Sequence, residues 1–259
     1  MERRSERPSA PVPASSPPGG AAALPRCAVC GTESRQAPFR PNPPEQPPDL
    51  DLRPGEPVRG AMGRWLQQCP GCGYAAPDIT KAHPAAALAV VAAPFRALLA
   101  DSSAPTLARR FLAWAHVLEE TGALHAAAEA TLQAAWVADD MGLPEYARIW
   151  RQEAVAMWRA GPGLDAEQTV RVVDALRRSG AWEDAGNTAQ ALLAGKPTEP
   201  VAQVMMLELR LIAAQDSARH SLASALPPPA RRPHVSHQPR MASRGPGAWA
   251  RLRQWLGWR

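Results

Sequence analysis

LEETGALHAA at residues 118–127 and LRRSGAWEDA at residues 176–185 share one pattern, and that pattern sets the architecture we expect. In each stretch a leucine precedes a glycine by four positions, a large residue follows two positions later, and an alanine follows five positions later. A weaker copy, GLPEYA, occupies residues 142–147. Glycine ends one helix and the small alanine allows the next helix to approach closely, so the pattern predicts helical hairpins.

Apolar residues around these stretches recur every three or four positions, which is typical of helices with one buried face. Glycine and proline interrupt the pattern at 122, 142, 161–163, 180 and 196–197, and no intervening segment alternates like a strand. The sequence therefore predicts a mainly α fold with helices near 84–100, 104–121, 123–141, 143–160, 165–179, 181–194 and 198–219. Most of the tryptophans on these helix faces are expected in the core: Trp114, Trp136, Trp150, Trp158 and Trp182.

The phrase GAWEDA, with Pro197 twelve residues after Ala185, resembles the inter-helix turn and terminal proline of a tetratricopeptide repeat. The glycines at 122, 142 and 180 do not keep the 34-residue period of that repeat. We therefore expect TPR-like antiparallel hairpins over residues 84–222, with a plain helical bundle as the alternative.

All four cysteines stand in two short motifs, CAVCG at 27–31 and CPGCGY at 69–74. Each has two residues between the cysteines and a glycine directly after, which is the form of a zinc knuckle. Four thiolates fill a tetrahedral shell and leave no position for water or substrate, so a structural role is expected for one Zn²⁺ per chain. The predicted ligands are Cys27, Cys30, Cys69 and Cys72. An iron centre, redox pairs and disulfides are the alternatives.

The 38 residues between Cys30 and Cys69 exceed the usual spacing in zinc ribbons. This insert is rich in proline, and we expect it to loop out of a zinc-ribbon-like module over residues 26–80. MGRWLQQ at 62–68 is expected to form a short strand entering the second knuckle. Asp49 and Asp51, in PDLDL, could recognise a basic partner or cap the ribbon.

PDLDLRPGEP at 48–57 and WLQQCPGCGYAAPDI at 65–79 resemble an uncharacterised bacterial family, the DUF2225-like proteins. The resemblance covers roughly residues 27–220 and departs at the first knuckle, where CAVC replaces the family's usual CPVC. It implies a zinc-ribbon-like head joined to TPR-like helices, and it implies no activity.

The two ends differ in composition from the middle, and residues 1–25 and 223–259 are expected to be disordered. Residues 230–259 carry seven arginines and no acidic residue. The closing GAWARLRQWLGWR at 247–259 could form a short amphipathic helix that contacts an anionic membrane or a partner groove, and the basic tail could also contact nucleic acid. The start of the chain lacks the apolar run of a signal peptide, so a cytoplasmic protein is expected.

Catalytic motifs are absent from the sequence: there is no glycine-rich phosphate loop and no nucleophile elbow. His116 and His125 fall within predicted helices without an acidic partner at suggestive spacing. We therefore expect no enzyme and no small-molecule substrate. The expected function is a zinc-stabilised scaffold whose helical array binds a protein or peptide segment. The alternative is a nucleic-acid-associated protein that uses the ribbon and the arginine-rich tail.

Overall fold

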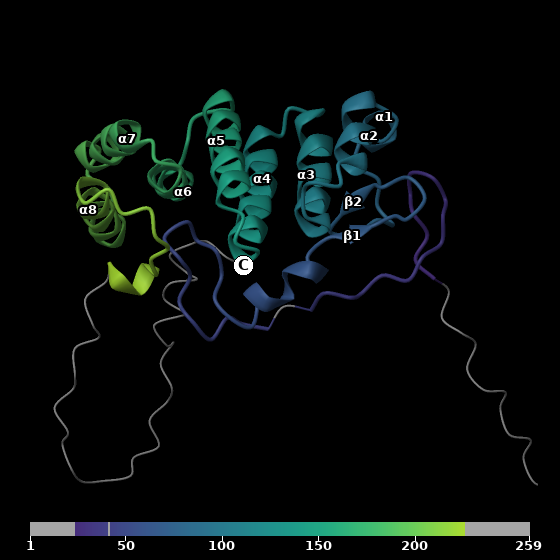
Figure 1. The fold of residues 1–259 in the computed structure, drawn as a ribbon, viewed down its shortest axis with the longest axis horizontal. Coiled ribbons are helices and arrows are strands. Elements are labelled where there is room, and N and C mark those ends of the chain that lie inside the picture. Colours follow the sequence, from purple (N-terminus) through teal and green to yellow (C-terminus); the bar gives the residue numbers. More distant parts are fainter. Residues whose placement is uncertain (1–23, 41, 226–259) are drawn as a thin grey trace, which may run out of the picture.

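The computed structural model describes residues 24–40 and 42–225, and it is mainly helical, as the sequence predicted. Figure 1 shows the earlier helices side by side in a row and the last three grouped at one end of it, with the two short strands at the opposite end. The disorder predicted for the two termini falls almost entirely on residues 1–23 and 226–259, which lie outside the described part of the chain. The amphipathic C-terminal segment lies there too.

The helical elements follow the predicted order with two differences. The helices are α1 (Ala86–Ala89), α2 (Ala93–Ala100), α3 (Thr106–Glu119), α4 (Leu124–Asp140), α5 (Pro144–Ala160), α6 (Ala166–Arg178), α7 (Trp182–Ala194) and α8 (Glu199–Ala213). The single helix predicted over 84–100 is wrong, because Ala92 is extended and a new helix begins at Ala93 with Pro94 in its first turn. The last helix ends at Ala213, six residues before its predicted end.

The three glycine turns explain the shared sequence pattern. Gly122, Gly142 and Gly180 all have positive φ, between +68° and +82°. The amide of the residue after each glycine donates to the carbonyl five positions earlier, as Ala123 does to Leu118 at 3.0 Å. This is the Schellman arrangement that ends a helix on glycine. The alanines five positions after these glycines lie in the first turns of the following helices and are buried: Ala127, Ala147 and Ala185.

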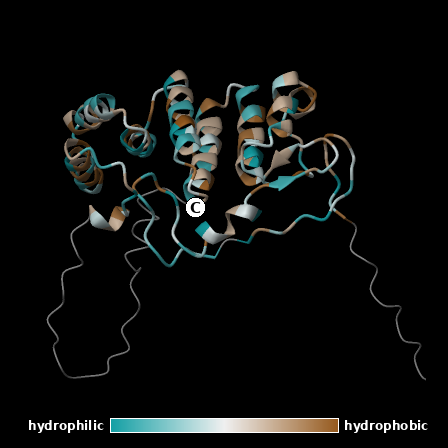
Figure 2. Ribbon diagram, in the orientation of Figure 1, coloured by the Kyte–Doolittle hydropathy of each residue, from teal (hydrophilic) through white to brown (hydrophobic). Residues whose placement is uncertain are grey.

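The main core lies between α3, α4, α5 and α6. Trp136, Trp150 and Trp158 are buried in it, which confirms their predicted role. Trp114 is partly buried where the main core meets the cysteine-rich end. Trp182 is different, because it is half-buried at the start of α7 and lines a shallow hollow with Glu183. Figure 2 shows brown, hydrophobic stretches next to teal, hydrophilic ones on the same helices, as expected for helices with one buried face.

Residues 42–66, which we call the excursion loop, do not loop out as predicted. The loop runs along the helical row to its far end and returns to the strands (Figure 1). Residues 48–55 are all buried, and the amides of Leu50 and Leu222 donate to His220 and Pro48 at 3.0 and 2.8 Å. The return contains a 3₁₀ helix, η1 (Arg59–Arg64), so the predicted strand is limited to Gln67–Gln68.

Asp49 and Asp51 neither face solvent nor cap the cysteine pairs. Asp51 accepts the indole N–H of Trp136 at 2.6 Å, and the carboxylate of Asp49 lies 2.5 Å from Arg59. Burial, and then the neighbouring Asp51, raise the pKa of Asp49 to about 6. The basic partners of these aspartates are therefore arginines of the same chain.

Among residues 24–40 and 42–225, no helix combines the length and apolarity needed to cross a membrane.

Candidate metal centre and neighbouring surfaces

The first cysteine pair sits in a tight turn over residues 26–33. The amide of Cys27 donates to Thr32 at 2.9 Å, and the amide of Gly31 donates back to Cys27 at 2.9 Å. Gly31 has φ +75°, a conformation that side chains strain, so glycine is required there. Arg26 and Glu33 pair as an antiparallel bridge and close the turn.

The second cysteine pair repeats this geometry bond for bond. The amide of Cys69 donates to Tyr74 at 2.9 Å, and the amide of Gly73 donates to Cys69 at 3.0 Å. Gly73 has φ +77°. The closing bridge here is the antiparallel pair β1 (Gln67–Gln68) and β2 (Ala75–Ala76). Both pairs therefore present their sulfurs from the same kind of knuckle, as the two sequence motifs predicted.

The two knuckles face each other and bring all four predicted cysteines together. The Sγ atoms of Cys27 and Cys72 are 3.8 Å apart, and those of Cys30 and Cys69 are 3.4 Å apart. All four Sγ atoms lie within 4.8 Å of one another. A tetrahedron of sulfurs at about 2.3 Å from a metal has edges of about 3.8 Å. The four cysteines are therefore close enough to bind one metal ion.

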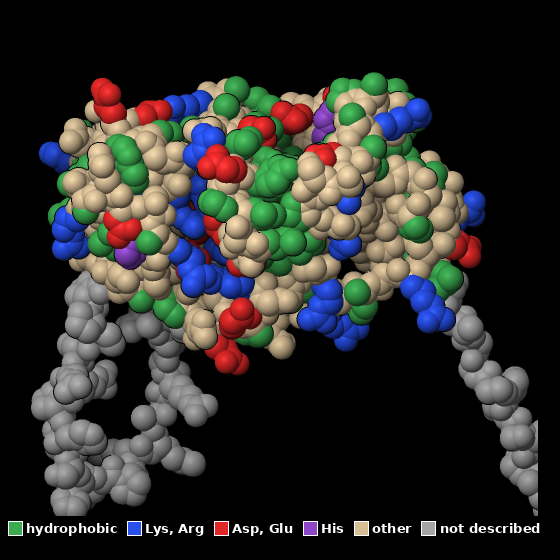
Figure 3. Space-filling view, in the orientation of Figure 1, with side chains coloured by type: hydrophobic (Ala, Val, Ile, Leu, Met, Phe, Trp, Pro, Cys, Tyr) green, Lys and Arg blue, Asp and Glu red, His purple; other side chains and the backbone are tan. Residues whose placement is uncertain are grey.

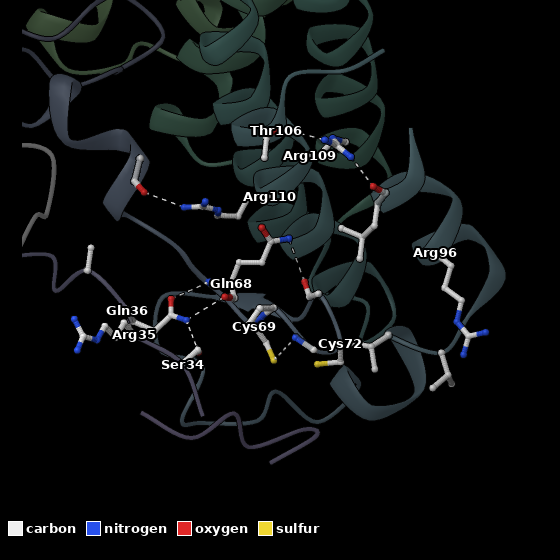
Figure 4. A pocket seen from close by; sticks show the side chains of 18 residues that line it. Ser34, Arg35, Gln36, Gln68, Cys69, Cys72, Arg96, Thr106, Arg109 and Arg110 are labelled. Atoms are coloured by element: carbon white, nitrogen blue, oxygen red, sulfur yellow. Dashed lines mark hydrogen bonds between the residues drawn. The ribbon is translucent and has the colours of Figure 1, made fainter. Parts of the chain in front are cut away.

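The surroundings of the sulfurs favour thiolates at the exposed side of the site. The hydroxyl of Thr32 lies 3.2 Å from the Cys30 sulfur, and this hydroxyl and the Thr32 amide lower the pKa of Cys30 to about 6. The amide of Gly71 donates to the Cys69 sulfur at 3.4 Å, as Figure 4 shows. Burial raises the pKa of Cys27 and Cys72, because it disfavours the charged thiolate. A bound cation would stabilise the thiolates and offset this cost.

The knuckles pack directly on the helical row. Cys27 and Cys69 belong to a buried cluster that also contains Tyr74, Phe95 and Val117 of α3. The Tyr74 hydroxyl donates to the carbonyl of Lys81 at 3.0 Å and accepts the amide of His83 at 3.0 Å. The metal site is therefore joined to α1–α3 through a shared core.

The two helical histidines do not join this site. His116 has Glu120 at 3.8 Å one turn later, so the prediction that it lacks an acidic partner is wrong, and its ring lies 5.8 Å from Phe95. His125 contacts Gln168 at 3.0 Å. Neither arrangement assembles an acid–base pair with a nucleophile.

A groove of about 590 Å³ opens between the excursion loop and helices α3 and α4. Its walls are mostly apolar: Phe39, Trp65, Leu66, Pro77, Trp114, Leu118, Ala126 and Ala130. Glu129 is its single charged lining residue apart from His125, and no lysine or arginine of the described chain lines it. Glu129 and Glu167 share Arg171, at 3.0 and 2.7 Å, so this side holds two carboxyl groups to one guanidinium, and burial raises the pKa of Glu129. Hydrophobic side chains also gather in the middle of the face drawn in Figure 3.

Comparisons with family models, with curated proteins and with solved structures found no match to this chain. The resemblance to the DUF2225-like family therefore stays a prediction.

Proposed function

We propose that the protein is a non-enzymatic scaffold in which one structural Zn²⁺, held by Cys27, Cys30, Cys69 and Cys72, fixes a helical array that binds a protein segment. The convergence of four sulfurs supports the metal. Zn²⁺ is the ion that four-cysteine sites hold most often in structural roles, and Fe is the alternative with the same ligands. A reducing, cytoplasmic setting suits paired cysteines that hold a metal.

The identity of the metal has a direct test. Elemental analysis of the purified full chain should find close to one zinc per chain, and Cys69→Ser should abolish it. Iron in its place would give visible absorption and would replace the zinc proposal. Metal-free protein with four titratable thiols and an unchanged fold would contradict a structural metal altogether.

The groove carries the proposal of a protein-binding role. It is apolar along most of its wall and has excess carboxylate at Glu129, so its proposed occupant is a short partner segment with aromatic or aliphatic side chains and a basic residue. Repeats of helical hairpins such as the TPR offer such surfaces to peptides, and our proposal includes a TPR-like character for this array.

A peptide library displayed on phage, panned against the full chain, tests this occupant. We expect enrichment of apolar peptides that contain lysine or arginine. Ala126 is exposed and lines the groove, so Ala126→Arg adds both bulk and positive charge there and should weaken the selected peptides at least tenfold. Ala156→Arg is the matched control, because Ala156 is exposed on α5 and does not line the groove. Equal binding by both variants would exclude the groove.

A role of the C-terminal tail in contacting a membrane or nucleic acid stays a separate prediction, since residues 226–259 are not described by the structure.

A further inference from the structure

A cavity of about 980 Å³ lies beside the second knuckle, between the knuckles and helices α2 and α3. Cys69, Pro70, Gly71 and Cys72 form one wall of it. Four arginines line it, and no aspartate or glutamate does: Arg35, Arg96, Arg109 and Arg110. This cavity is distinct from the apolar groove, because the two share no lining residue.

The four arginines differ from most others in the described chain, because none of them has a carboxylate within ion-pair distance there. Elsewhere nine arginines do form ion pairs: Arg53, Arg59, Arg148, Arg151, Arg159, Arg171, Arg177, Arg178 and Arg219. Burial without a counter-charge lowers the pKa of Arg110. The cavity therefore holds a concentration of uncompensated positive charge.

Two of the arginines are anchored and two are free. Arg109 donates to the carbonyl of Leu99 at 2.5 Å, and Arg110 donates to the carbonyl of Gly63 at 2.9 Å. Arg35 and Arg96 are exposed and lie on opposite sides of the cavity, and Figure 4 draws no hydrogen bond to either. The fixed pair forms a charged back wall, while the free pair can turn toward a ligand at the rim.

The metal does not cancel this charge. Residues 24–40 and 61–110 carry eight Lys and Arg against three Asp and Glu, whereas residues 111–225 carry nine against fifteen. A divalent metal with four thiolates adds a charge of about −2 to the first group, which leaves it positive. In Figure 3, blue side chains outnumber red ones over the end of the molecule that holds the strands and α1–α2.

We propose that this cavity binds the phosphates of a nucleotide chain, as a single strand of nucleic acid presents them. Arginine matches the geometry of phosphate oxygens, and the wide separation of Arg35 and Arg96 suits successive phosphates better than one isolated ion. The polar side chains of Gln36, Gln68 and Thr106 offer further hydrogen bonds. No aromatic ring lines the cavity for base stacking, so binding should depend little on sequence.

The test is fluorescence anisotropy with a labelled ten-nucleotide oligothymidylate over a salt series, using the full chain. The double variant Arg35→Gln/Arg96→Gln removes the two free arginines, which anchor no other described group. Each lost phosphate contact should reduce the slope of log K against log salt by about 0.7, and together they should weaken binding roughly 25-fold at 0.1 M salt. The control Arg148→Gln/Arg210→Gln removes the same charge from exposed positions on α5 and α8. The basic tail is present in every protein compared, so it does not account for a difference.

Each outcome decides the proposal. A weakened, flatter salt dependence in the first variant alone supports it. Equal loss in both variants means binding by overall charge and overturns it, as does unchanged binding in the first variant. Competition by pyrophosphate or a free mononucleotide as strong as by the oligonucleotide would assign the site to a small phosphate ligand instead of a strand. Circular dichroism and zinc content verify that both variants are folded.

Discussion

At one end of the molecule the two cysteine turns are brought together at four sulfur atoms. At the other end the helices are held together by buried arginines and carboxylates. The excursion loop connects the two ends, because it leaves one knuckle, reaches the far end of the helical row and returns to the other knuckle (Figure 1). Midway along the row Arg53 is 1% exposed and contacts Asp140 of α4, and Asp51 accepts the indole N–H of Trp136 from the same helix. The same segment is therefore held between the four-cysteine cluster and ion pairs with the helices.

The two ends differ in how many parts of the chain must supply the interacting side chains. The metal site needs four side chains and two glycine turns, all within two short motifs. The far end needs partners from many elements: Arg177 of α6 contacts Asp174 at 2.5 Å and Glu208 of α8 at 2.6 Å, and it donates to the carbonyls of Asp216 and Ala218. A site of the first kind can form locally, whereas the second forms only when the helices have already packed.

Removing the metal should have the largest effect on stability, and this effect should be confined to the end that holds the four cysteines. Chelation, or Cys69→Ser, leaves buried thiols without a cation, and structural zinc contributes on the order of 10 kcal/mol in small zinc domains. By hydrogen exchange, we expect residues 26–33 and 68–76 to lose protection while residues 49–55 keep theirs. Added zinc should restore the wild-type pattern after chelation. Simultaneous loss at both ends would mean that the far end depends on the metal.

The far-end counterpart is Arg177→Met. It removes the guanidinium and leaves the carboxyl groups of Asp174 and Glu208 buried without their cationic partner, and breaking a buried pair by removing one partner costs about 3–5 kcal/mol. Urea denaturation should show a loss of that size at pH 7. Arg210→Met on α8 is the control, since Arg210 is exposed and should change stability by about 0.5 kcal/mol or less. Equal stability of the two variants would refute the role given to the Arg177 network.

Leu50→Ala tests the apolar part of the same end. Leu50 is fully buried in a cluster with Val173, Met205 and Leu222, so deleting its side chain should cost about 2–5 kcal/mol. Leu88→Ala, at a position 76% exposed, should cost little. A small loss at Leu50 would show that the loop rests on the helices without stabilising them.

The contrast also separates what the sequence reveals from what it conceals. The proximity of the four cysteines and the positions of the glycine turns were predictable, because both follow from short motifs whose spacing carries the information. The path of the excursion loop was not, because proline-rich composition suggests solvent exposure. PDLDLR did carry a signal: Leu50 and Leu52 alternate with acidic residues just before Arg53. Its meaning depends on Trp136, Arg178 and Asp140, which lie more than 80 residues away.

The smallest effect is expected in the pH dependence of the far end. Burial, and then the neighbouring Asp174, raise the pKa of Glu208 well above its ordinary value. The folded chain therefore keeps a proton that the unfolded chain releases, so this group's contribution is complete below about pH 4.5 and falls as the pH rises. Glu208→Gln keeps the shape of the side chain without the titration. Urea denaturation should show that the wild type loses more stability than this variant between pH 5 and pH 8. Parallel pH curves would mean that Glu208 is fully ionised in the fold and that Arg177 balances both carboxylates unaided.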